Sequence, residues 1–311
     1  MHTILGANGV IAQELSRALV SFSPNIRQVS RNPRKVNPTD EIVVADLLDA
    51  KATANAVSGS EVVYLVAGLK YDLSVWQEQW PQVMRNVIDA CSHHGARLVF
   101  FDNVYAYGLV SGLMTEETPF NPISKKGEVR ARIATMLLDD MRCGNLQAMI
   151  VRAADFYGPN AVNSFPHATV FSRLGVGKSP QWIGNPKTVH TFTYTPDTGP
   201  AIAMLGRSPE AYGQTWHLPT TREPLTGEDF VRLACELAKQ PCKLQVAPRW
   251  ILKLMGIFMP MLRENEEMMY QFDYDYRFDS SKIEAAYGLQ ATTYQRGIRE
   301  SLRAVLQSSV E

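Results

Sequence analysis

The chain has 311 residues, of which 45% are apolar and 20% charged, and its 31 basic side chains balance its 31 acidic ones. A formal net charge of zero gives no overall attraction to polyanions, so we expect neither nucleic acid nor an anionic membrane surface as a partner. The 20 glycines and 18 prolines are close to average usage, which excludes collagen-like and Pro/Gly-rich disordered classes.

The first half of the chain alternates short apolar runs with helix-like stretches, which predicts a parallel sheet built from βαβ units. Several runs are nearly continuous Val, Ile, Leu and Phe, as expected where helices cover both faces of a sheet. The predicted strands cover His2–Leu5, Ile26–Ser30, Glu41–Ala45, Glu61–Ala67, Arg97–Asp102 and Gln147–Arg152. Helices are predicted at Ile11–Val20, Val75–His94 and Ser124–Cys143, with Pro81 expected to kink the second helix or to mark its start.

After Arg152 this alternation ends, and mostly helix-like segments follow a stretch punctuated by Pro and Gly. We therefore expect an α/β fold: a Rossmann-type doubly wound parallel sheet over residues 1–157, and a smaller, mostly helical substrate domain over residues 158–311. Part of residues 187–207 is expected to return to the sheet. Ligands of such sheets bind at the carboxyl ends of the strands.

A glycine turn follows the first predicted strand. Gly6 permits a tight turn, Gly9 lets the backbone approach a diphosphate, and Ala12 lets the next helix lie close to the strand. The start of that helix offers free N–H groups to an anion. The residues expected at the diphosphate are Gly6, Asn8, Gly9, Val10 and Ile11. This context, strand then turn then amphipathic helix, predicts a dinucleotide site rather than a chance turn.

The charges after the second strand indicate which dinucleotide is bound. An NAD site places a carboxylate about 20 residues after the turn, whereas a basic residue there accommodates a 2′-phosphate. Between Glu14 and Asp40 the chain has no acidic residue and five basic ones. Ser30 and Arg31 stand where the adenosine ribose is expected. We therefore expect NADP rather than NAD; the alternative is that these cations only solvate a surface loop.

Two later strand ends add to this site. Asp46 is expected to accept the adenine amino group, and Leu47 to pack on the ring. Ala67 and Gly68 are small enough to leave room for the cofactor beside the chain. In the loop that follows, Tyr71 is expected to contact the substrate near the nicotinamide.

Residues 250–262 form the one apolar run that raises a membrane question, and they are fewer than the roughly 20 that a span needs. We expect a core helix there, or alternatively a wall or lid for an apolar substrate, and no membrane span. No basic-then-apolar leader opens the chain, and the four cysteines form no CxxC pair. We therefore expect a cytoplasmic protein with reduced thiols and no metal site.

Several motifs together resemble the extended short-chain dehydrogenase/reductase superfamily, in its NAD-dependent epimerase/dehydratase family. They are Gly6-x-x-Gly9-x-x-Ala12, Asp46-Leu47, Tyr107-Gly108, Thr115 to Pro119, Arg152 to Pro159 and Thr193 to Asp197. The resemblance covers most of the chain. It implies an oxidoreductase-type Rossmann domain, a small C-terminal substrate domain, and a homodimer joined through the helices placed at 75–94 and 124–143.

The catalytic residues of this family do not carry over. Its members use a Ser or Thr just after the fifth strand and a Tyr-x-x-x-Lys on the next helix, where the tyrosine exchanges a proton with a substrate hydroxyl. Here Asn103 stands at the Ser/Thr position, Lys126 at the Tyr position and Arg130 at the Lys position. Asp155 replaces the Asn before Tyr-Gly-Pro, and His190 replaces an Arg often found seven residues before the final Asp. The chain thus resembles an atypical member.

Lys126 and Arg130 are four residues apart, so a helix places them on one face, which we expect to look toward the nicotinamide. A neighbouring guanidinium and burial both disfavour a charged ammonium, which suits Lys126 to exchange a proton. Asn103 would hold a substrate oxygen, and Arg130, which keeps its charge, would clamp an anion or carbonyl. Lys125 should point elsewhere and serves as a control.

Asp155 and His190 would bind the substrate, and we expect both residues to share one cleft with Lys126 and Arg130. The predicted function is an NADP-binding oxidoreductase or epimerase-like enzyme that transfers hydride to or from a small hydroxylated metabolite. One alternative is that Lys126 and Arg130 only form a solvated face. Another is a non-catalytic NADP-binding redox sensor or regulatory protein. Polar groups at five expected pocket positions favour catalysis, because a decayed site would more often fill with apolar side chains.

Overall fold

The computed structural model describes residues 1–247, 264 and 266–308, and within it the chain forms two compact units. Unit 1 comprises Met1–Gly108, Phe120–Ala153 and Thr198–Leu218. Unit 2 comprises Leu109–Pro119, Ala154–Asp197 and the described part of Pro219–Glu311. In this division Leu109–Pro119 belongs to unit 2 and Thr198–Leu218 to unit 1, whereas the sequence placed the boundary after residue 157 with part of residues 187–207 returning to the sheet.

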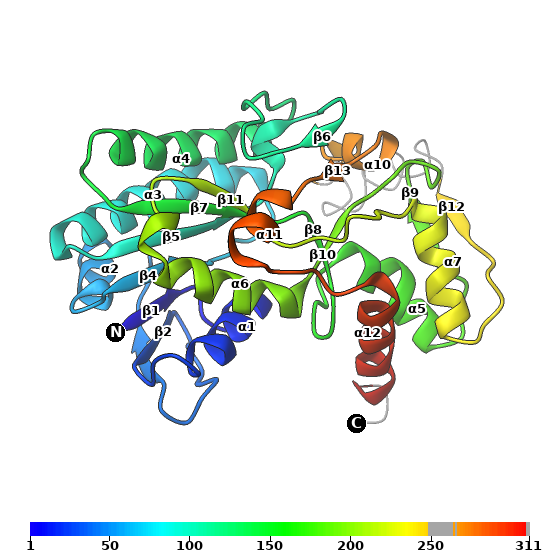
Figure 1. Ribbon diagram of the computed structural model, residues 1–311, viewed down its shortest axis with the longest axis horizontal. Coiled ribbons are helices and arrows are strands. Elements are labelled where there is room, and N and C mark those ends of the chain that lie inside the picture. The colour runs from blue at the N-terminus through cyan, green and yellow to red at the C-terminus, as the bar shows by residue number, and fades with distance from the viewer. Residues whose placement is uncertain (248–263, 265, 309–311) are drawn as a thin grey trace. The chain divides into compact units, whose positions relative to one another are not determined.

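Unit 1 is built on a parallel sheet of seven strands in the order β11-β7-β5-β4-β1-β2-β3 (Figure 1). The strands are β1 (His2–Leu5), β2 (Ile26–Ser30), β3 (Glu41–Val44), β4 (Val62–Leu65), β5 (Arg97–Asp102), β7 (Ala148–Arg152) and β11 (Thr215–His217). The six expected strands and the Rossmann-type fold are confirmed. β1 pairs with β2 on one side and with β4 on the other, so the strand order reverses there and opens a ligand-binding position.

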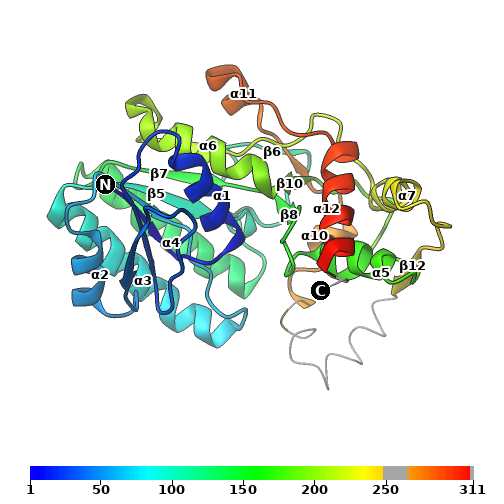
Figure 2. The same ribbon diagram turned by 90° about the horizontal axis from the view of Figure 1, so that it is seen from below.

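Helices cover both faces of this sheet, with α1 and α6 on one face and α2, α3 and α4 on the other (Figure 2). Their bounds are α1 (Val10–Leu19), α2 (Ala50–Val57), α3 (Leu73–His94), α4 (Lys125–Arg142) and α6 (Thr195–Arg207), with short turns η1 (Tyr105–Tyr107) and η3 (Pro209–Ala211). Pro81 does not mark the start of its helix, because Asp72 caps α3 well before it by accepting from Ser74 and Val75.

A large apolar cluster lies between the sheet and the α3 and α4 helices. Trp80, Val87, Ile133 and Leu137 are almost fully buried there against Phe100 of β5. Burying a side chain of this size contributes about 1.5–3 kcal/mol. This packing fixes α3 and α4 on the sheet and therefore also fixes the loops that precede them.

Unit 2 combines short strand pairs with helices around an aromatic core. The parallel pairs are β6 (Leu113–Met114) with β13 (Arg277–Phe278), β8 (Asp155–Tyr157) with β10 (Phe192–Tyr194), and β9 (Gln181–Ile183) with β12 (Gln245–Ala247). The helices are η2 (His167–Phe171), α5 (Ser172–Gly175), α7 (Gly227–Leu237), α10 (Tyr270–Asp273), α11 (Ser281–Tyr287) and α12 (Tyr294–Ser308). Tyr157, Trp182, Phe192 and Phe230 are buried together at its centre.

The apolar run 250–262, expected as a core helix or a substrate wall, lies outside the described residues. Within the described ranges, none of the helices has the length and apolar character that a membrane crossing needs.

Candidate active site

The turn after β1 lies directly against the end of β4. Gly6 has a φ of 104°, and a Cβ built on it would stand 2.5 Å from the Ala67 nitrogen. A side chain is therefore excluded at this position both by conformation and by space. Gly68, in contrast, would direct a Cβ into open space. Room for a dinucleotide beside Ala67 and Gly68 stays a prediction.

The N-terminus of α1 is available to an anion. Gly9 occupies the cap position and, having no side chain, makes no cap hydrogen bond to the first turn. The N–H groups of Val10 and Ile11 belong to that turn, which has no intrahelical acceptors for them. A helix of ten residues with free N–H groups and a positive dipole end suits a diphosphate. The residues present therefore fit the expected cofactor.

Asn8 connects this turn to the segment after β2. Its Nδ2 donates to the Asn32 carbonyl at 2.7 Å, and its Oδ1 accepts from the Arg34 N–H at 3.0 Å. Ser30 accepts from the Asn32 N–H, and the Arg31 side chain is exposed. The expected ribose-binding residues are thereby held beside the expected diphosphate position.

Asp40, the first acidic residue after Glu14, has a carboxylate that is hydrogen bonded inside the protein. It is buried and accepts hydrogen bonds from the Val36 and Asn37 N–H groups and from the Gln28 amide. Burial alone would raise its pKa, but these hydrogen bonds outweigh burial and hold the pKa below its ordinary value. This carboxylate is therefore not offered to a ribose.

The expected adenine residues lie after β3. Asp46 is exposed and accepts from the Leu48 N–H at 3.1 Å, while Leu47 is half-buried against the core. The Leu47 carbonyl accepts from the Asn86 amide of α3 at 2.8 Å, which anchors this segment to the helix.

Lys126 is buried in the first turn of α4. Ser124 caps the helix by accepting from the Gly127 N–H at 3.0 Å, and a Cβ on Gly127 would stand 2.7 Å from the Tyr105 carbonyl oxygen. The helix therefore starts pressed against η1. Lys126 is 1% exposed, and its Nζ lies 4.7 Å from the centre of the Tyr71 ring. Lys125 is the control that was expected: its side chain is 62% exposed.

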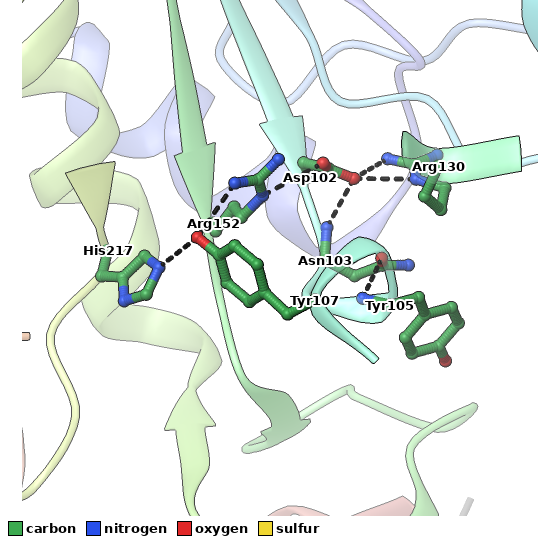
Figure 3. Close-up of polar contacts among 7 residues, drawn as sticks. All are labelled: Asp102, Asn103, Tyr105, Tyr107, Arg130, Arg152 and His217. Carbon is green, nitrogen blue, oxygen red and sulfur yellow. Dashed lines mark hydrogen bonds and ion pairs between the residues drawn. The ribbon is translucent and has the colours of Figure 1, made fainter. Parts of the chain in front are cut away.

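Arg130 is paired inside the protein (Figure 3). Asp102 Oδ1 accepts from Arg130 Nε at 2.7 Å and from Nη2, and Asp102 Oδ2 accepts from Arg152 Nε at 3.2 Å. The Arg130 guanidinium also lies 4.5 Å from the centre of the Trp80 ring. A solvated Lys/Arg face is therefore wrong. Asp102, which Arg130 shares with Arg152, holds the guanidinium, and the role of Arg130 as a substrate clamp stays a prediction.

This network continues along the strand ends to β11. Arg152 Nη1 donates to the Tyr107 hydroxyl at 2.9 Å, and that hydroxyl lies 2.9 Å from His217 Nε2 (Figure 3). Asp102, Arg152 and His217 are each about 1% exposed or less. Sequence reasoning missed this network. Its signal was that Asp102 and Arg152, an acidic and a basic residue, each end a run of apolar residues in neighbouring strands. Burying either charge is costly unless the two meet.

Asn103 is oriented by its neighbours. Its N–H donates to Asp102 Oδ1 at 2.8 Å, and its Oδ1 accepts from the Tyr105 N–H at 3.0 Å (Figure 3). The hydrogen bond to a backbone N–H fixes which end of the amide is the oxygen. The Asn103 NH2 group has no acceptor in the part of the chain that the structure describes, and it suits a substrate oxygen.

Asp155 and His190 form a pair in unit 2. His190 Nε2 lies 2.9 Å from Asp155 Oδ2, and Nδ1 lies 3.1 Å from the Gln271 carbonyl oxygen. The imidazole is stacked between Phe272 and Tyr276, each 4.6 Å away. The His190 side chain is 1% exposed and that of Asp155 23%, so the carboxylate is the outward member. The structure thus joins Asp155 to His190 and Lys126 to Tyr71; a cleft shared by the two pairs stays a prediction.

The comparisons with known proteins agree with this architecture. The sequence model of the NAD dependent epimerase/dehydratase family matches residues 2–217. No curated protein matches the chain.

Solved structures of similar fold include a double mutant of DesIV, a dTDP-glucose 4,6-dehydratase from Streptomyces venezuelae, with NAD bound (18% identity, 98% of this chain and 96% of that chain, TM-score 0.79). The UDP-glucose 4-epimerase of Thermus thermophilus in complex with NAD is 18% identical over 98% of this chain and 99% of that chain, with a TM-score of 0.77. The UDP-glucuronic acid 4-epimerase of Bacillus cereus in complex with NAD is 16% identical over 98% of this chain and 96% of that chain, with a TM-score of 0.78. At this identity the likeness shows the fold. Because the family model matches more than two-thirds of this chain, the chain belongs to the NAD dependent epimerase/dehydratase family.

Proposed function

We propose that this protein is an NADP-dependent enzyme that moves hydride to or from a small hydroxylated metabolite, as an oxidoreductase or an epimerase. The observation that carries the proposal is the uncapped N-terminus of α1 beside the Gly6–Ala67 contact, at the reversal of strand order. Family membership supports a nicotinamide cofactor. The similar structures hold sugar nucleotides or NAD, which supports a polar, hydroxylated substrate.

The cofactor site would be formed by residues of unit 1 alone. Those assigned to the diphosphate are Gly6, Asn8, Gly9, Val10 and Ile11; to the adenosine, Ser30, Arg31, Asp46 and Leu47; and to the space beside β4, Ala67 and Gly68. When bound, the nicotinamide supplies the hydride acceptor or donor. The similar structures contain NAD, so the preference for NADP rests on Arg31 and on the commitment of Asp40.

The chain itself would handle the proton. In the reductive direction the Lys126 ammonium would donate a proton to the carbonyl oxygen and become the neutral amine. In the oxidative direction that neutral amine would accept the hydroxyl proton while the C–H bond breaks with its electron pair and a carbonyl forms. The Asn103 NH2 group would donate to the reacting oxygen. Asp155, held by His190, would accept hydrogen bonds from substrate hydroxyl groups. Tyr71 would line the site beside Lys126.

The test is turnover of NADP+ or NADPH with a panel of sugar nucleotides, hydroxy acids and small carbonyl compounds. We expect Lys126→Ala to bind NADPH like the wild type and to lose about 100-fold or more in kcat. Lys125→Ala, which changes an exposed neighbour on the same helix, should keep the wild-type rate. Equal rates in Lys126→Ala and the wild type would remove the assignment of Lys126.

A non-catalytic NADP sensor is the second candidate. The observation that favours it is the burial of Arg130 in its pair with Asp102, which withdraws a cation from the expected catalytic face. NADPH binding without turnover of any substrate in the panel would favour the sensor.

A further inference from the structure

The ammonium group of Lys126 lies in the protein interior, where charged groups are rarely found. Lys126 is 1% exposed, and water therefore cannot solvate its charge fully. Among its contacts is the face of the Tyr71 ring, whose centre lies 4.7 Å from Nζ. The face of an aromatic ring is negative and attracts a cation, most strongly where water is excluded. The ring is thus placed to fix the end of a long, flexible side chain.

The Tyr71 ring is itself held by the residues on either side of it. The Lys70 carbonyl accepts from Trp76 Nε1 at 2.9 Å, and Asp72 accepts from the Ser74 N–H at 3.0 Å. Hydrogen bonds, above all with Ser74, lower the pKa of Asp72 to about 2, so this cap stays charged at neutral pH. The Tyr71 ring also meets the Trp76 ring edge-on at 5.5 Å. Both chain neighbours of Tyr71 are therefore tied to α3.

The other end of Lys126 is equally fixed. Its backbone lies in the first turn of α4, between the Ser124 cap and Gly127, which contacts η1. Lys125 shares this backbone, but it pairs with Glu128 at 3.8 Å and its side chain is mostly exposed. The ammonium groups of these two adjacent lysines therefore have different contacts: the Tyr71 ring for Lys126 and the Glu128 carboxylate for Lys125.

We propose that Tyr71 is a positioning residue for Lys126, acting through its aromatic face and not through its hydroxyl group. This inference rests on the proposed function, in which Lys126 transfers the proton. A ring fixed to α3 and a backbone fixed in α4 both restrict where Nζ can lie. Without the ring, Lys126 gains other rotamers, and the proton transfer step slows while cofactor binding does not change.

The experiment separates the ring from the hydroxyl group by comparing Tyr71→Phe with Tyr71→Leu. The first readout needs no substrate: competitive acetylation with acetic anhydride, followed by mass spectrometry of the peptides that carry Lys125 and Lys126. We expect labelling of Lys126 relative to Lys125 to match the wild type in Tyr71→Phe. In Tyr71→Leu it should rise about ten-fold, since a desolvated cation–π contact is lost.

The second readout is turnover of the panel substrate that the wild type uses fastest. We expect Tyr71→Leu to lose about ten-fold or more in kcat with an unchanged NADPH affinity, and Tyr71→Phe, which keeps the ring, to lose clearly less than Tyr71→Leu. Wild-type labelling and kcat in Tyr71→Leu would overturn the inference. So would a Tyr71→Phe protein as impaired as Tyr71→Leu, because the hydroxyl group would then be decisive. Wild-type turnover in Lys126→Ala would remove the proton-transfer role of Lys126, and with it this inference, whatever the labelling shows; absence of turnover in the wild type would overturn the proposed function instead.

Discussion

Asp102 receives two guanidinium groups in a place that water does not reach. Burying each arginine costs free energy, and the carboxylate between them offsets that cost only while it stays ionised. Asp102 also accepts from the Asn103 N–H, so the same carboxylate sets the start of the segment that carries the proposed oxygen-binding amide. The ion network therefore supports the site, and we expect its removal to lower the free energy of unfolding.

Asp102→Asn keeps the shape of the side chain and removes its charge, which leaves Arg130 and Arg152 buried without a counter-charge. We expect the free energy of unfolding to fall by about 3–5 kcal/mol in urea titrations. Asp139→Asn is the matched control, because Asp139 pairs with Arg142 on the surface, where such pairs contribute about 1 kcal/mol or less. Equal losses in the two variants would mean that the buried network contributes no more than an exposed pair.

Arg31 carries the expected preference for NADP. Its side chain is exposed at the end of β2, and it can reach a 2′-phosphate without breaking a buried contact. Arg31→Ala should weaken NADPH binding about ten-fold, which is about 1.4 kcal/mol, and leave NADH binding nearly unchanged. Fluorescence titration with both nucleotides measures this. Arg17 lies in the same basic interval and pairs with Glu14, so Arg17→Ala should change neither affinity. A wild type that prefers NADH ten-fold would refute the assignment.

Two glycines in the turn between β1 and α1 are expected to have different roles, Gly6 in stability and Gly9 in cofactor binding. Gly6→Ala would force a positive φ on alanine and press its Cβ on Ala67, which we expect to cost at least about 1–3 kcal/mol of stability. At Gly9 a Cβ would meet only the Gly6 carbonyl oxygen, at an ordinary 3.6 Å. Gly9→Ala should therefore keep the wild-type urea midpoint without cofactor and lose NADPH affinity. A Gly6→Ala protein as stable as Gly9→Ala would contradict the contact with β4.

Elements with a strong local pattern were predictable from the sequence. The strands His2–Leu5 and Ile26–Ser30 and the turn at Gly6 follow from apolar runs and glycine spacing, which need no knowledge of distant residues. The strand Thr215–His217 was not predictable, because its three residues become a strand only by pairing with Ala148–Arg152. Local pattern likewise placed Lys126 and Arg130 on one helical face.

The surroundings of that face depend on residues far away in the chain. Asp102 is 28 residues from Arg130 and 50 from Arg152. A lysine and an arginine four residues apart look the same in sequence whether they face water, a substrate or a buried carboxylate. Only the packing of β5, β7 and α4 decides among these, and it decides differently for the two residues: an aromatic face for Lys126 and an ion pair for Arg130.

The free energy of unfolding of the whole chain is expected to depend on pH, and the buried His2 determines the sign of one contribution to that dependence. Burial lowers the pKa of His2 below its ordinary value of 6.5, and its Nδ1 lies 3.1 Å from the buried Tyr64 hydroxyl. Below about pH 6.5 the unfolded chain therefore binds a proton that the folded chain does not, so acid favours unfolding. This contribution is fully present above that pH and is lost as the pH falls toward the folded-state pKa. For one site the slope cannot exceed about 1.4 kcal/mol per pH unit.

We therefore expect the wild-type free energy of unfolding, measured by urea titration, to fall between about pH 7 and about pH 5, and His2→Gln to fall less steeply over the same range. Glutamine keeps a polar atom near Tyr64 and does not titrate, so the difference between the two profiles isolates the proton on His2 from any loss of packing. A constant offset between parallel curves would mean that packing alone was lost and that His2 has no share in the acid sensitivity. Convergence of the curves as the pH falls is the signature of a histidine that the fold keeps neutral.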